Sequence, residues 1–187
     1  MNTQWTAVEL QAELEQLGAS PRDNGTLAMI VCRPAEGERL VLERANLDPR
    51  EGLIGDNWRT RGSKRTEDGS AHPDMQIAMM NSRVIQAVAK DRDRWPLAGD
   101  QLFIDLDVSV ENLQPGQRIA IGTAVLEITD VPHTGCDKFT ARFGHDAIRF
   151  VNSPEGRQLR RRGIYARVVQ AGTISVGDRI SKIERKG

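Results

Sequence analysis

From residue 26 onward, the sequence is a succession of short apolar segments separated by glycine, proline, asparagine and aspartate. Apolar segments of this length, bounded by turn residues, are typical of β-strands. The clearest pair, at residues 118–121 and 124–128, flanks Gly122-Thr123, a link with glycine first that favours a type II′ hairpin. Many short strands at close spacing, with few helices, predict a mostly β fold that is either a barrel or a sandwich.

The two ends of the chain have a different pattern. Leu10, Leu14 and Leu17 recur at helical spacing with polar residues between them, which predicts a helix over residues 5–17. A chain of 187 residues has room for one core of ordinary size, and its last six residues are mostly charged. We therefore expect a helical extension, one β-rich domain and a charged tail, over residues 1–25, 26–181 and 182–187.

Three shorter segments inside the β-rich region carry helix signals. Asn81 is a favourable N-cap for a short amphipathic helix. Residues 144–151 are predicted to form a second helix, and Ser153 followed by Pro154 begins a third that ends at Gly163. We interpret the arginines of this last helix as charge that suits its C-terminus, at positions 157, 160, 161 and 162.

The segment before the first of these helices is polar. Residues 54–58 follow a glycine-containing turn and are predicted to form a short strand. Residues 59–73 contain almost no apolar side chain, which predicts a long loop. Loops of this length are usually functional or disordered, so this one is a candidate lid over a site.

The charge and the start of the chain exclude several classes of partner. The 26 basic and 26 acidic side chains balance, so no net charge favours nucleic acid or a membrane surface. No apolar run approaches the roughly 18 residues of a membrane span. The first 18 residues contain no basic side chain of the kind that opens a signal peptide. We therefore expect a cytoplasmic protein with no nucleic-acid or membrane partner.

The two cysteines, Cys32 and Cys136, differ in their surroundings. Two cysteines do not make a disulfide scaffold, so we expect two free thiols. Cys32 lies in an apolar strand and is expected to be structural. Cys136 follows His133 by three residues and precedes Lys138 and Arg142, and positive groups nearby lower the pKa of a thiol. Cys136 is therefore the candidate reactive residue, and a packing role is the alternative.

The run Pro132-His133-Thr134-Gly135-Cys136-Asp137-Lys138-Phe139 resembles the cysteine segment of MOSC domains, which are named for the C-terminal domain of molybdenum cofactor sulfurase. Further segments resemble the family in the same order, at residues 52–56, 99–102, 111–113, 162–169 and 172–178. The likeness extends over residues 26–180. The sequence is similar to a stand-alone, bacterial-type member of the family. It departs from some bacterial members because their His-Gly-Gly stretch is absent, and His72 stands in that region.

The resemblance implies a MOSC-type β-barrel in which Cys136 carries sulfur as a persulfide or ligates molybdenum. In the sulfur-carrier version of this hypothesis, His133 or Lys138 would steady the thiolate. Binding the anionic pterin phosphate of the molybdenum cofactor would need further side chains, for which the candidates are Thr134, Arg142, Asn81 and Arg83. Because no aminotransferase-like domain is present, the sulfur would come from a donor enzyme and pass to an acceptor protein or cofactor, and pyridoxal phosphate is not expected to bind.

Four hypotheses about the function remain open. The protein is a sulfur carrier resembling a sulfurtransferase, or a molybdenum-dependent oxidoreductase in which the soft Cys136 sulfur binds the metal. Alternatively, it is a non-catalytic module that binds a small anion or cofactor in the same pocket, or a purely structural interaction domain. The sequence leaves the oligomeric state open.

Overall fold

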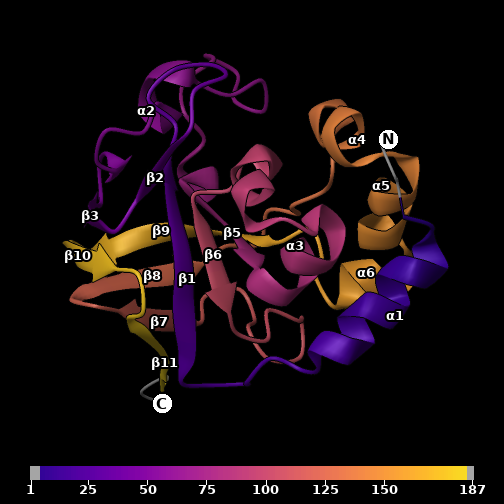
Figure 1. Ribbon diagram of the computed structural model, residues 1–187. Helices are drawn as coiled ribbons and strands as arrows, with labels where there is room; N and C mark the ends of the chain where they lie inside the picture. Colours follow the sequence, from indigo (N-terminus) through magenta and orange to yellow (C-terminus); the bar gives the residue numbers. More distant parts are fainter. Residues whose placement is uncertain (1–4, 185–187) are drawn as a thin grey trace.

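The computed structural model describes residues 5–184, in which short strands predominate (Figure 1). The strands are β1 Gly25–Cys32, β2 Leu40–Leu42, β3 Arg44–Asp48, β4 Gly52–Leu53, β5 Ile77–Asn81, β6 Leu102–Asp105, β7 Arg118–Ile121, β8 Ala124–Ile128, β9 Ile164–Gln170, β10 Gly172–Ser175 and β11 Arg179–Ile183. The helices are α1 Ala7–Leu17, α2 Trp58–Arg61, α3 Ser82–Ala89, α4 Asp137–Phe143, α5 His145–Asn152 and α6 Pro154–Gln158, with 3-10 turns η1 Pro73–Met75 and η2 Arg92–Ala98. None of the helices within residues 5–184 is long and apolar enough to cross a membrane.

A closed barrel forms the centre of the molecule. Its strands follow the order β11-β7-β8-β9-β5-β6-β1, and pairing of β1 with β11 closes the ring. β2 extends the sheet beyond β1, and β10, β3 and β4 form a smaller sheet. The mostly β barrel expected from the sequence is confirmed.

One pair of neighbouring strands in the barrel is parallel. β5 and β6 run in the same direction, whereas the other paired strands are antiparallel. Parallel neighbours need a crossover connection, and α3 with η2 supplies it. This crossover places helical structure against one face of the sheet.

The core has two layers, and β5 separates them. Its residues are buried on both faces: Met79 belongs to the cluster inside the barrel, whereas Met80 belongs to the cluster between barrel and helices. Helices α1, α3, α4, α5 and α6 gather on one side of the barrel, whereas α2 lies apart from them near β2 and β3 (Figure 1). α1 packs there against α3 and α5, and its Leu10 is 1% exposed. The predicted N-terminal helix therefore contributes to the second core.

Several local predictions are confirmed because their signals lie within a few residues of each other. Gly122 between β7 and β8 has a φ of 56°, as the first position of a type II′ turn requires. The Asn81 side chain accepts hydrogen bonds from the backbone N–H groups of Arg83 and Val84 and caps α3. Ser153 caps α6, with Pro154 in its first turn.

Other local predictions are wrong. Residues 54–58 form no strand; after the short β4, the chain turns and begins α2 at Trp58. α6 ends at Gln158 instead of continuing to Gly163, because Arg160 adopts a left-handed conformation with a φ of 48°. The arginines beyond it are therefore not helix-terminal surface charge: Arg161 and Arg162 are 3% and 6% exposed.

The end of the chain continues the barrel further than the charged composition indicates. Lys182 and Ile183 form the last residues of β11, where the backbone N–H of Lys182 donates to Asp23. Residues 185–187 of the predicted tail lie outside the described residues.

Candidate functional site

Cys136 is exposed and stands at the first turn of α4. Its backbone is extended, with a φ of −125°, and its carbonyl accepts the N–H of Thr140, so Cys136 is the N-cap residue of the helix. Its side chain makes no capping hydrogen bond. The thiol is therefore neither buried in the core nor occupied in holding the helix, and it is available to a partner in solution.

Gly135 explains why the cysteine segment can lie so close to α5. A Cβ at this position would overlap Cδ1 of Ile148, so any other residue here would require that side chain to shift. The Gly135 N–H also donates to the side-chain oxygen of Asn152 at 3.3 Å. These contacts fix the chain immediately before the thiol.

Beside α4 lies a cavity of about 280 Å³, which we call the basic cleft. α4 contributes two of its cations, and the segments after β1 and in α2 contribute the others. The charged side chains that line it are Arg33, Arg39, Arg61, Lys138, Arg142 and the acidic Glu36. Arg33 pairs with the buried Asp56, and Lys138 pairs with Glu36. The other three arginines leave the cleft with uncompensated positive charge, which attracts an anion.

Two of these cations, Arg39 and Arg61, have lowered pKa values because they are partly buried beside other cations. Burial lowers the pKa of the Arg61 guanidinium, and the nearby Arg33 lowers it further. Burial likewise lowers the pKa of Arg39, assisted by Arg142, Arg33 and Arg61. Both arginines keep their positive charge at neutral pH, because a guanidinium loses its proton only far above that range. A bound anion would relieve this mutual repulsion.

The other cations of the cleft have partners. Lys138 pairs with Glu36 at 3.0 Å, in a contact between two exposed side chains. Arg142 donates to the carbonyl of Leu97 at 2.6 Å. These contacts hold the cations at the rim and leave their charge only partly compensated.

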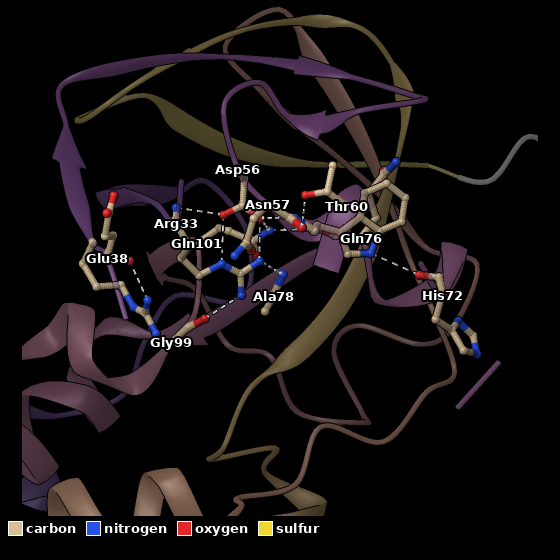
Figure 2. Close-up of polar contacts among 12 residues, drawn as sticks. Arg33, Glu38, Asp56, Asn57, Thr60, His72, Gln76, Ala78, Gly99 and Gln101 are labelled. Atoms are coloured by element: carbon tan, nitrogen blue, oxygen red, sulfur yellow. Dashed lines mark hydrogen bonds and ion pairs between the residues drawn. The ribbon is translucent and has the colours of Figure 1, made fainter. Parts of the chain in front are cut away.

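Arg33 fixes the floor of the basic cleft through a buried ion pair (Figure 2). Its Nε and terminal nitrogen donate to the two carboxylate oxygens of Asp56, each at 2.8 Å, and its other terminal nitrogen donates to the carbonyl of Gly99. Asp56 also accepts the backbone N–H groups of Arg33 and Trp58. This network holds the end of β1, the start of α2 and the turn before β6 together.

An unpaired acceptor lies in the same cleft. The side-chain oxygen of Asn57, directly after Asp56, is buried and has no hydrogen-bond partner within residues 5–184. A buried polar atom of this kind normally has a partner. Asn57 itself lines the cleft, beside the arginines.

His133 is brought to the interior. Its side chain is 5% exposed, its Nδ1 lies 3.5 Å from an Asp100 carboxylate oxygen, and its ring lies against Tyr165. Burial lowers the pKa of His133 well below its usual value, and Arg162, Arg33 and Arg65 lower it further. The imidazole is therefore uncharged near neutral pH, and it supplies no positive charge to a thiolate.

The predicted site residues fall into three places. Lys138 and Arg142 line the basic cleft, on the helix that Cys136 begins. Thr134 and His133 line another cavity. Asn81 and Arg83 line a third, next to the end of α1.

Asn81 and Arg83 have structural partners in that third place. Asn81 caps α3 and donates to the carbonyl of Leu106, and Arg83 forms an ion pair with Asp105 at 2.9 Å. The structure does not bring either residue to the basic cleft.

The sequence interpretation did not identify Arg33, Arg39 and Arg61 as site residues. They lie far from Cys136 along the chain, and no spacing rule connects them with it. Within the described residues, no group of three or more His, Cys, Asp or Glu side chains could hold a metal ion.

Comparison with known proteins agrees with this fold. Two solved structures superpose on most of the chain: YuaD from Bacillus subtilis, with 14% identity and a TM-score of 0.64 over 87% of this chain and 97% of that one, and YiiM from Escherichia coli, with 16% identity and a TM-score of 0.55 over 87% and 71%. None of the curated proteins compared with the chain matches it in sequence. The family model of the MOSC domain matches residues 66–181, more than half of the sequence. The chain belongs to the MOSC domain family.

Proposed function

We propose that this protein handles sulfur or the molybdenum cofactor through Cys136, with the basic cleft as the binding site for the anionic part of its ligand. The chain has a domain of the molybdenum cofactor sulfurase type in general. The single observation that carries the proposal is an exposed thiol at the start of the helix whose Lys138 and Arg142 line the cleft.

The residues of the cleft fit an anionic pterin cofactor. A phosphate monoester carries nearly two negative charges at neutral pH, and the arginines on the cleft are suited to such an oxyanion. The Cys136 sulfur is a soft ligand of the kind that suits molybdenum. When bound, the cofactor would supply the metal centre for oxygen or sulfur transfer, and Cys136 would hold it in place.

The sulfur-carrier version needs no cofactor at the moment of transfer. The Cys136 thiolate attacks the outer sulfur of a persulfide on a donor enzyme, a new S–S bond forms on Cys136, and the donor sulfur leaves as a thiolate. No external oxidant or reductant is needed, because one S–S bond replaces another. Lys138 would stabilise the negative charge of the thiolate and of the resulting persulfide. A second thiolate or a cofactor then accepts the sulfur.

The test is the intact mass and molybdenum content of the full chain purified without reductant. The wild type is compared with Cys136→Ser, with Arg61→Gln in the cleft and with two controls. Cys32→Ala removes the buried thiol, whose pKa is raised by burial and by Asp56. Arg149→Gln removes an exposed arginine that does not line the cleft.

A reductant-labile gain of about 32 Da, the mass of one sulfur, that disappears only in Cys136→Ser would support the sulfur carrier. Molybdenum that disappears in Cys136→Ser and falls in Arg61→Gln, but persists in both controls, would support the cofactor version. Wild-type protein that gains neither sulfur nor molybdenum, even after incubation with a persulfide donor or with the cofactor, would overturn the proposal.

A binding module without thiol chemistry is the second candidate. One observation favours it: the cleft is lined without Cys136. In that case inorganic phosphate would bind equally well to the wild type and to Cys136→Ser, and it would bind more weakly to Arg61→Gln. Equal binding combined with an unreactive Cys136 would select this candidate over the first.

A further inference from the structure

A second cavity lies on the other side of the cysteine segment. It has a volume of about 380 Å³ and is bounded by residues 129–134, by α5 and α6, and by the start of β9. Most of its wall is apolar, with Val110, Val131, Val151 and Ile164 among the lining residues. A cavity of this size and character has room for a small organic molecule.

The charges on this cavity sum to one positive charge. Arg162 is neutralised by Asp100, with which it forms a buried ion pair at 2.8 Å. The other charged lining residues are Arg157, Arg160 and the acidic Asp130. Two cations and one carboxylate leave a single uncompensated charge, which suits a monoanion better than a phosphate dianion.

The two remaining arginines are not neutralised by a carboxylate of their own. Arg157 is exposed on α6, and its guanidinium has no acidic partner within residues 5–184. Arg160 donates to the main-chain carbonyls of Leu113 and Val108, and burial lowers its pKa while Asp130 opposes the change. An oxyanion at this end of the cavity would meet the planar guanidinium groups of both arginines, which donate hydrogen bonds.

An aromatic pair with an unpaired polar atom forms another part of the wall. The rings of His133 and Tyr165 lie 4.2 Å apart, centroid to centroid, at 31°. The His133 side chain is 5% exposed, and its Nδ1 has no hydrogen-bond partner within the described residues. Flat rings beside apolar side chains favour a planar ligand, since aromatic rings pack well in offset arrangements.

We propose that this cavity binds a small aromatic carboxylate, with the carboxylate at Arg157 and Arg160 and the ring among Val110, Val151 and the His133–Tyr165 pair. The site is separate from the basic cleft and does not depend on chemistry at Cys136. It shares with the cleft only the cysteine segment, because residues 129–134 line one cavity and α4 lines the other. The two sites can therefore be tested independently.

The test is isothermal titration of the full chain with benzoate, with neutral benzamide as the matched ligand. We expect benzoate to bind and benzamide to bind at least about ten-fold more weakly, because it lacks the charge that the arginines recognise. Arg157→Gln should weaken benzoate binding about ten-fold for the same reason. Val110→Trp should abolish it, because Val110 lines the cavity at a position that is 38% exposed and has space for a larger ring.

Three variants serve as controls. Arg149→Gln removes an exposed arginine outside the cavity, Arg61→Gln alters the basic cleft, and Cys136→Ser removes the thiol. All three should bind benzoate like the wild type. Loss of binding in Arg61→Gln would place the carboxylate in the cleft and overturn the proposal. So would the absence of benzoate binding at concentrations up to about 10 mM, or full binding in a folded Val110→Trp.

Discussion

At the scale of single residues, Cys136 and His133 contradict the simple expectation that neighbours in the sequence act together. Cys136 is exposed, and His133, three residues earlier, is buried beside Asp100 and Tyr165. The uncharged imidazole packs inside the segment, whereas Lys138 and Arg142, on the helix that Cys136 begins, line the basic cleft. The two residues should therefore respond differently to substitution.

Cys136→Ser should leave the fold intact or stabilise it. Cys136 is the N-cap of α4 without a capping hydrogen bond, and serine is a preferred N-cap, so we expect a gain of up to about 1 kcal/mol in the free energy of unfolding. Urea denaturation measures the gain, and labelling with a thiol reagent confirms that only Cys32 remains. Cys136→Ala, which cannot cap the helix, is the control. Destabilisation by both variants would show that Cys136 has a packing role.

His133 should make stability depend on pH below about 6.5, the pKa of an unperturbed histidine. Its pKa is lowered in the folded state, so the unfolded chain binds the extra proton first. The free energy of unfolding then falls as the pH decreases from 6.5 toward the folded pKa, by at most about 1.4 kcal/mol per pH unit.

Urea denaturation of the wild type and of His133→Gln between pH 7.5 and pH 5.5 measures this dependence, and we expect a smaller slope in the variant. Asp100 acts in the opposite direction, because burial raises its pKa against the effect of Arg162 and Arg33. In the folded protein Asp100 keeps its proton to a higher pH than in the unfolded chain. Its contribution to the free energy of unfolding therefore decreases as the pH rises. Comparing wild type and variant removes this shared contribution, and parallel curves would contradict the prediction.

At the scale of secondary-structure elements, the start of the polar segment between β4 and β5 is anchored by the Asp56 carboxylate. Asp56 connects α2 to β1 through Arg33, and the carbonyl of Gly99 joins the same guanidinium to the turn before β6 (Figure 2). The expected long loop thus begins with a helical turn that is anchored at the basic cleft. Its anchoring, more than its length, determines where Arg61 lies.

Asp56→Asn should destabilise the protein by about 3–5 kcal/mol, since it leaves the Arg33 charge buried without its partner. The matched control is Glu51→Gln, which breaks the exposed ion pair with Arg59 and should cost at most about 1 kcal/mol. Thermal or urea denaturation of the two variants gives the comparison. Equal effects would mean that burial does not distinguish the two ion pairs.

At the scale of the whole molecule, the barrel and the helical layer form two cores that share strands. β1 contributes Ile30 to the barrel interior and Met29 to the helical layer, in the same way that β5 divides its residues. The cysteine segment leaves the barrel after β8 and crosses to the helical side at α4 (Figure 1). Residues of this crossing line both cavities: residues 129–134 line the larger one, and α4 lines the basic cleft.

Leu10→Ala should therefore destabilise the whole domain and not only its N-terminal helix. Leu10 is 1% exposed in the helical layer, and removing a buried leucine side chain costs about 2–5 kcal/mol. Val8→Ala is the control on the same helix, because Val8 is 79% exposed and should change stability by less than about 0.5 kcal/mol. A single unfolding transition that shifts in Leu10→Ala is expected; loss of α1 alone would contradict it.

The sequence by itself determined the features whose causes lie within a few residues. Gly122 predicts the β7–β8 turn, Asn81 predicts the start of α3, and the alternation of short apolar segments with turn residues predicts a β-rich fold. In the site, the sequence indicates Cys136 with Lys138 and Arg142, since these lie within one short segment. The order of motifs also indicates the MOSC family, which the family model confirms.

Only the tertiary structure decided the features that depend on distant contacts. Closure of the barrel joins β1 to β11 across the whole domain, and the basic cleft brings Arg33, Arg39 and Arg61 to α4. Burial keeps His133 uncharged beside Asp100, and it converts Arg162 from an expected surface charge into half of an internal ion pair. These outcomes follow from desolvation and from packing between segments far apart in sequence. Local sequence patterns do not predict such contacts.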